Sequence, residues 1–217
     1  MLRNSTFVWG SSDVGLTKKN ISLPDRVDAL QGFGVRSLQL GSGHCVAVTG
    51  SEHAFACGQN ESGQLGHGDR SRRTTPERLR ALCHVRVLRV ACGGNHTLLL
   101  CDAGVYAVGS NSHGQLGLGG ASDALRSTST PQLIAALGSI GSNIADVACG
   151  ASISAAITAR GELLTWGCAA YGLLGNDNAP GGSNTEDARM PTTVAALARE
   201  VTKQIVFGAT HALTLWY

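Results

Sequence analysis

The sequence of 217 residues has few charged or aromatic side chains, at 15% and 5%, and only five prolines. No stretch approaches the roughly 18 consecutive apolar residues that a membrane-spanning helix requires. The first ten residues contain no apolar run of signal-peptide length. With 43% hydrophobic residues the chain can still bury one good core. We therefore predict a globular intracellular protein of the nucleus or cytoplasm that is neither secreted nor inserted in a membrane.

The motifs of common catalytic and cofactor sites are also missing. There is no Gly-x-Ser-x-Gly elbow, Walker loop, His-Glu-x-x-His pair, dinucleotide fingerprint or Cys-x-x-Cys knuckle. Cys92 with His96, or Cys83 with His84, has no spacing known from zinc modules. The odd set of seven cysteines predicts buried free thiols rather than a disulfide framework. We expect no metal, no cofactor and no catalysis by the chain's own side chains.

What the sequence has in excess is glycine, with 29 residues, many of them in an internal repeat. An aromatic or leucine residue, two further residues and a glycine recur four times, at intervals of 48, 51 and 58 residues. A second glycine follows five residues later, and in the middle copies it opens a Gly-Gln-Leu-Gly phrase. We expect these glycines at tight turns. They are Gly10, Gly58, Gly109 and Gly167, followed by Gly15 in the first copy and by Gly63, Gly66, Gly114, Gly117, Gly172 and Gly175 in the others.

A turn of the form Gly-x-x-His follows in three of the four copies. Its histidines are His44, His96 and His211, and the third copy has Ile153 instead. Because they share one place in the repeat, they should lie in separate units and bond their own local backbone, not form a triad or metal site. The recurring aromatic residues are predicted to lie in the core. They are Trp9, Phe55, Tyr106 and Trp166.

The segments between the turns are short and rich in β-branched, leucine or aromatic residues, without a sustained helical period. About fifty residues with three or four strands is the size of one propeller blade. We therefore predict an all-β, single repeat domain over residues 1–217, with about four blades. The copies are 7–54, 55–105, 106–163 and 164–217, the last one truncated.

The repeated phrase, followed by Gly-x-x-His and an apolar strand, resembles the regulator-of-chromosome-condensation repeat over essentially the whole chain. The order of the variants is similar to the telophase-disc branch of that family, the regulator-of-chromosome-condensation-2-like proteins. These variants are GQLGHGD at Gly63 to Asp69, GQLGLG at Gly114 to Gly119 and GC-x-x-YG-x-LG at Gly167 to Gly175. The copy with Ile153 in place of histidine also resembles that branch.

The resemblance implies a β-propeller of seven blades, of which this chain would supply about four as an open arc. Unpaired strand edges at the ends of an arc favour aggregation. We therefore expect the remainder of a longer protein, a partner chain or a second copy of this chain to complete the ring. A closed four-bladed ring is the alternative.

One feature does not repeat: seven of the 17 basic residues lie between positions 70 and 89. The connector after the phrase of copy two should loop over one rim and meet an acidic GTPase surface, an acidic histone surface or phosphates. A solvated connector without a partner is the alternative, and direct nucleic-acid binding stays open. The candidate partner-binding residues are Arg70, Arg72, Arg73, Arg78 and Arg80.

For function, the resemblance implies a protein-interaction propeller that binds a Ras-superfamily small GTPase, or a chromatin or spindle component. One alternative is a guanine-nucleotide exchange factor that acts only as a complete seven-bladed protein. Another is a structural adaptor or a non-functional fragment. The family's founding member promotes exchange on Ran with a β-wedge that lengthens one loop after a strand glycine. Here the four loops keep one spacing, and the sequence contains no such wedge.

Overall fold

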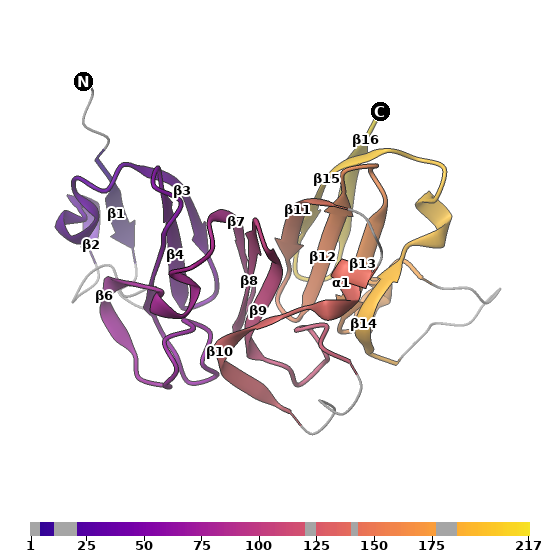
Figure 1. The fold of residues 1–217 in the computed structure, drawn as a ribbon, viewed down its shortest axis with the longest axis horizontal. Helices are drawn as coiled ribbons and strands as arrows, with labels where there is room; N and C mark the ends of the chain where they lie inside the picture. The colour runs from indigo at the N-terminus through magenta and orange to yellow at the C-terminus, as the bar shows by residue number, and fades with distance from the viewer. Residues whose placement is uncertain (1–4, 11–20, 120–124, 140–142, 177–185) are drawn as a thin grey trace.

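The computed structural model, drawn in Figure 1, describes residues 5–10, 21–119, 125–139, 143–176 and 186–217. Nearly all regular structure in these residues is antiparallel β-sheet, which confirms the predicted all-β class. None of the described helices is long and apolar enough to cross a bilayer. The turn predicted at Gly15 lies outside the described residues.

Three sheets have four strands each, paired in the order in which they follow along the chain. The first consists of β3 (Val35–Leu40), β4 (His44–Thr49), β5 (Ala54–Gly58) and β6 (Arg73–Arg78). The second consists of β7 (Val87–Cys92), β8 (His96–Cys101), β9 (Gly104–Ser110) and β10 (Ser127–Leu133). The third consists of β11 (Ile144–Cys149), β12 (Ile153–Thr158), β13 (Leu163–Gly167) and β14 (Ala188–Thr193).

Two shorter sheets flank these three along the chain. They are β1 (Phe7–Gly10) with β2 (Ile21–Arg26), and β15 (Thr202–Phe207) with β16 (Ala212–Trp216). The helical segments in the described residues are all short and lie between strands. They are η2 (Asp28–Leu30), η3 (Arg80–Leu82), α1 (Ala135–Ser139), η5 (Ala170–Gly172) and η6 (Ala195–Leu197).

The sheets stand side by side along an arc, as Figure 1 shows. The first strands meet one another, β3 with β7, β7 with β11 and β11 with β15, while the fourth strands form the opposite edge of each sheet. This is the radial arrangement of propeller blades. Copies two, three and four each begin at the third strand of a full sheet, so a copy spans the second half of one sheet and the first strands of the next.

The Gly-Gln-Leu-Gly phrase forms the joint between neighbouring sheets. Its leucine, Leu65 or Leu116, is fully buried in the apolar cluster between two sheets. Its first glycine lies against the fourth strand of the next sheet, where a Cβ on Gly63 would be 2.6 Å from the Cα of Ser129. A Cβ on Gly114 would be 2.7 Å from the Cα of Arg189, in the fourth strand of the third sheet. Because both glycines also have φ near +80°, at 82° and 75°, only glycine fits there.

The other recurring glycines of the described copies also occupy the left-handed region, with φ between 66° and 110°. Gly10 ends β1. The glycines with positive φ are Gly58, Gly109, Gly167, Gly66, Gly117, Gly172 and Gly175.

The two buried histidines bond across the joints. His44 Nε2 lies 3.0 Å from the hydroxyl oxygen of Thr97 in the second sheet. His96 Nε2 lies 2.9 Å from that of Ser154 in the third. Each hydroxyl donates to the backbone oxygen of the phrase's glutamine, so the imidazole N–H must be the donor to the hydroxyl. For these two histidines the predicted bonds to the local backbone were wrong, because the turn directs each ring at the next sheet. His211, in the turn between β15 and β16, is exposed.

Two of the four recurring aromatic residues are buried, as predicted. Trp166 is completely buried, its Nε1 donating to the backbone oxygen of Gln115 at 2.9 Å, and Phe55 is 9% exposed. Tyr106 is partly buried against the cluster between the first two sheets. The prediction was wrong for Trp9, which is 63% exposed because β1 lies in a two-stranded sheet.

Replacing Gly114 by alanine should destabilise the fold by about 2 kcal/mol or more, because the new Cβ meets both a forbidden φ and the backbone of the third sheet. Gly32 has φ +85° with open space around it, so Gly32→Ala should cost about 1 kcal/mol. Gly138 has neither constraint, and Gly138→Ala should not destabilise. Urea unfolding of the three variants measures this order. Equal losses of unfolding free energy would contradict the role of Gly114 at the joint.

The buried histidines should make the fold acid-sensitive. Burial lowers the pKa of His44 from its ordinary 6.5 to about 4, and burial with the nearby His44 lowers that of His96 to about 3. The unfolded chain therefore binds more protons below pH 6.5. The free energy of unfolding is therefore highest above that pH. It falls by about 3 kcal/mol per histidine as the pH drops toward 4.

Urea unfolding between pH 7.5 and 4.5 measures this loss. His96→Gln keeps a donor for Ser154 but cannot become protonated, so its free energy of unfolding should fall less steeply with pH. His84→Gln, at an exposed position, is the control and should follow the parent chain. A parental slope in His96→Gln would show that other groups cause the acid sensitivity.

Candidate interaction surface

Three long loops lie at one rim of the arc, which we call the loop rim. Their described parts are residues 59–72, 111–119 with 125–126, and 168–176 with 186–187, and each follows the third strand of a full sheet. A buried asparagine organises the first two: the Oδ1 of Asn60 accepts from the N–H of Leu65, and that of Asn111 accepts from the N–H of Leu116. The described parts of these loops therefore have a defined conformation at their base.

The loop rim carries exposed arginines from all three full sheets. Arg70 is held across a joint, because its Nη1 donates to the backbone oxygen of Glu61 at 2.9 Å and its Nη2 to the hydroxyl of Ser127 at 2.7 Å. Two members of the set were predicted as partner-binding residues. The other two come from the following sheets, since Arg126 lies in the loop before β10 and Arg189 is the second residue of β14. The set is Arg70, Arg72, Arg126 and Arg189.

Arg73, in contrast, forms ion pairs within its own sheet and loop. Its side chain is only 18% exposed, and its guanidinium forms ion pairs with Asp69 at 2.6 Å and Glu77 at 3.0 Å. The hydrogen bond from Arg73 holds the pKa of the Asp69 carboxyl below its usual range. Arg73 thus fastens the start of β6 to the loop.

Arg78 and Arg80 lie at the opposite rim. Residues 73–78 form the strand β6, so the prediction of one connector looping over a single rim was wrong. At about 3.3 Å per residue, the strand separates its two ends by roughly 17 Å. Arg78 and Arg80 are exposed, and no other described residue forms a hydrogen bond or ion pair with their side chains. The five predicted arginines therefore do not form one patch.

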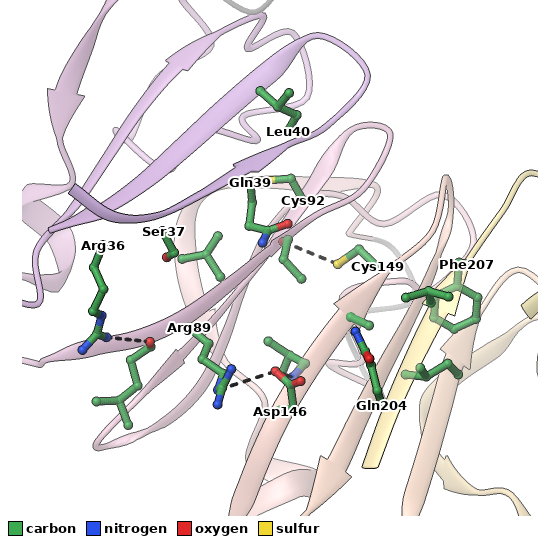
Figure 2. Close-up of a pocket in the computed structure, with 17 residues that line it drawn as sticks. Arg36, Ser37, Gln39, Leu40, Arg89, Cys92, Asp146, Cys149, Gln204 and Phe207 are labelled. Atoms are coloured by element: carbon green, nitrogen blue, oxygen red, sulfur yellow. Dashed lines mark hydrogen bonds and ion pairs between the residues drawn. The ribbon is translucent and has the colours of Figure 1, made fainter. Parts of the chain in front are cut away.

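The concave side of the arc holds a groove of about 810 Å³, lined by the first strands β3, β7, β11 and β15 (Figure 2). Polar contacts cross from strand to strand along it. Arg36 Nη2 donates to the backbone oxygen of Leu88 at 2.9 Å, and the Arg89 guanidinium lies 3.7 Å from the Asp146 carboxylate. Gln39 and Gln204 add uncharged polar groups to this lining, in which no strong charge dominates.

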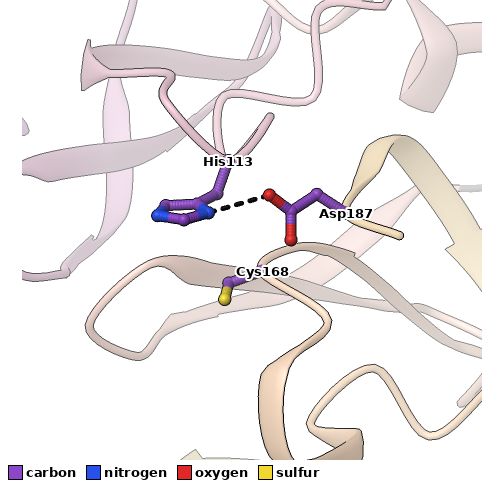
Figure 3. A group of neighbouring side chains, drawn as sticks. All are labelled: His113, Cys168 and Asp187. Carbon is purple, nitrogen blue, oxygen red and sulfur yellow. Dashed lines mark hydrogen bonds and ion pairs between the residues drawn. The ribbon is translucent and has the colours of Figure 1, made fainter. Parts of the chain in front are cut away.

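One group of metal-ligating side chains comes together on the loop rim, which the sequence did not indicate (Figure 3). His113 Nδ1 lies 2.8 Å from Asp187 Oδ2, and the thiol of Cys168 lies beside them. The three are half-buried and come from two different sheets. Among the described residues, neither Cys92 with His96 nor Cys83 with His84 belongs to such a group of three.

The sequence matches the model of the "Regulator of chromosome condensation (RCC1) repeat" at residues 52–100, 102–157 and 160–215. A second model of the same repeat matches residues 87–115 and 144–172. Among curated proteins, mouse Protein RCC2 is 40% identical over 163 residues, which are 74% of this chain and 30% of that protein. This agrees with the branch that the order of the repeat variants predicted.

Solved structures of the same fold cover nearly the whole chain. Human WBSCR16 superposes with a TM-score of 0.82 at 27% identity, over 99% of this chain and 54% of that one. Prp20p from Saccharomyces cerevisiae superposes with a TM-score of 0.83 at 20% identity, over 98% of this chain and 52% of that one.

The chain thus spans about a third of the length of mouse RCC2 and about half of these two structures. Its three full sheets correspond to blades of an RCC1-type β-propeller, and its glycine phrases form the joints between them. The chain belongs to the regulator of chromosome condensation (RCC1) repeat family.

Proposed function

We propose that this chain is part of a protein-interaction propeller that binds a Ras-superfamily small GTPase through its loop rim. The observation that carries the proposal is the set of exposed arginines there, which come from three consecutive sheets. A row of cations on one rim attracts an acidic partner surface and speeds its association.

The anchoring of Arg70 supports a binding role for this rim. Its two hydrogen bonds join Glu61 of one loop to Ser127 of the next sheet. A side chain that is already held loses little conformational entropy when a partner binds. Arg70 can therefore contribute a fixed positive charge, whereas Arg78 and Arg80 on the opposite rim have no such support.

The relatives support partners of this kind. The solved structure of Prp20p was described together with its binding properties to Gsp1p and histones, and yeast RCC1 (Prp20) was solved bound to Kap60. We propose the GTPase as the partner, and binding to a histone is an outcome that the test below separates from it. The unaltered loop spacing favours binding without Ran-type exchange.

The direct test is biolayer interferometry of the full chain with immobilised Ran-, Rac- and Ral-type GTPases, each in nucleotide-free, GDP-bound and GTP-bound form. We expect one of them to bind, with an affinity that falls as salt rises. Equal affinity for the nucleotide-free and loaded forms would support a role in binding alone and would rule out nucleotide exchange. Binding to a histone alone, or to none of these proteins, would refute the GTPase proposal.

The variant Arg72→Ala/Arg126→Ala should weaken the complex about tenfold or more and flatten its dependence on salt, because two rim charges are lost. Arg78→Ala/Arg80→Ala removes the same charge from the opposite rim and should bind like the parent chain. Arg73 is left intact, since its ion pairs stabilise the loop. Similar weakening in both variants would mean that net charge, and not the loop rim, drives association.

A further inference from the structure

We propose that His113, Cys168 and Asp187 bind one divalent transition-metal ion of the zinc class at the joint between the second and third sheets. Each residue offers one ligand atom, and these atoms all lie within 4.8 Å of one another. Imidazole, thiolate and carboxylate are the ligands that zinc takes in proteins, whereas a thiol and an imidazole do not suit Mg²⁺ or Ca²⁺.

The carboxylate and the imidazole already face each other. His113 Nδ1 donates to Asp187 Oδ2 at 2.8 Å, and the other carboxylate oxygen accepts from the N–H of Ala169 at 3.0 Å. Figure 3 shows Nδ1 turned toward Asp187, with Cys168 beside both. Zinc bonds of about 2.0–2.3 Å place tetrahedral ligands roughly 3–4 Å apart, so small side-chain rotations suffice. The ion would replace the proton on Nδ1 and that of the thiol.

The preceding joint has the same backbone without these ligands. In its loop Ser62 stands where His113 stands in the next: the backbone N–H of each donates to the Oε1 of the following glutamine, at 3.0 and 2.9 Å. The glycine after each lies against the fourth strand of the next sheet. The two loops therefore share these contacts, and His113 takes the place of Ser62.

The strand positions are equivalent in the same way. Ser110 is paired with Ser127 between β9 and β10, one residue beyond the pair of Gly109 with Thr128. In the third sheet Gly167 is paired with Ala188, so Cys168 and Asp187 occupy the places of the two serines.

Three serines at one joint are thus replaced at the next by a histidine, a cysteine and an aspartate. The joint forms without these residues, because the first joint has only serines there, so packing does not require the change. The three changes lie in two different sheets but meet at one point. Since all three side chains are half-buried, an ion can enter from solvent and keep a fourth position for water.

The test is titration of the full reduced chain with Co²⁺, which reports tetrahedral thiolate ligation by its visible and charge-transfer absorption, followed by displacement with Zn²⁺. We expect one equivalent of Co²⁺, displaced by one of Zn²⁺, and a zinc-dependent rise in melting temperature. Cys168→Ser should abolish the charge-transfer band and lower zinc affinity by about 100-fold or more.

Cys83→Ser is the matched control, because Cys83 is an exposed thiol beside His84 and its loss should leave the band unchanged. His113→Asn keeps an N–H donor for Asp187 but removes the imidazole. It should melt like the parent chain without metal and lose the zinc-dependent shift. The proposal is overturned if the parent binds no Co²⁺, if the band survives in Cys168→Ser, or if it disappears in Cys83→Ser.

Discussion

The joint between neighbouring sheets is the interaction on which the rest of the structure depends. At each of the first two joints a glycine lies against the next sheet, a leucine fills the space between the sheets, and a buried histidine reaches across to a hydroxyl group. That hydroxyl donates to the glutamine backbone oxygen of the same phrase. A buried polar group that loses its partner costs about 1–3 kcal/mol, so a slip of one sheet against another would break several contacts at once. The joints therefore fix the curvature of the arc.

The same joints position the candidate sites. Because the loops close the joints at their base, their outward side chains are presented from a fixed backbone. Arg70 illustrates this, since its guanidinium spans the joint that its own loop forms. His113 and Asp187 meet because the glycine after His113 brings its loop against the strand that Asp187 precedes. The residues that we propose to bind at this rim thus come from neighbouring sheets, and neither sheet alone would contain a site.

The sequence predicted the structural features that form within one copy, but it did not predict the contacts that form between copies. The period, the all-β class and the glycine turns follow from local antiparallel strands, whose partners lie a few residues apart. Thr97 lies 53 residues from His44, and equivalence between copies does not say which copies touch. Arg70 and Arg80 are close in sequence, but the strand β6 separates them. His113, Cys168 and Asp187 have no motif spacing; only a comparison of equivalent positions, copy by copy, would have shown that all three change together.

The third copy, which lacks the histidine, follows the same physical rule as the others. His44 pairs with Thr97 and His96 with Ser154, and each hydroxyl residue directly follows the repeat position of the next histidine. The next such position holds Ala212, and the residue that would face it is the buried Ile153. Donor and acceptor are thus both replaced by apolar side chains, which changes the stability little. The loss of only one of them would leave a buried polar group without a partner. At each joint the side chains of the two facing sheets match, either both polar or both apolar. A change of three residues together across one joint, at His113, Cys168 and Asp187, therefore points to a shared ligand and not to unrelated substitutions.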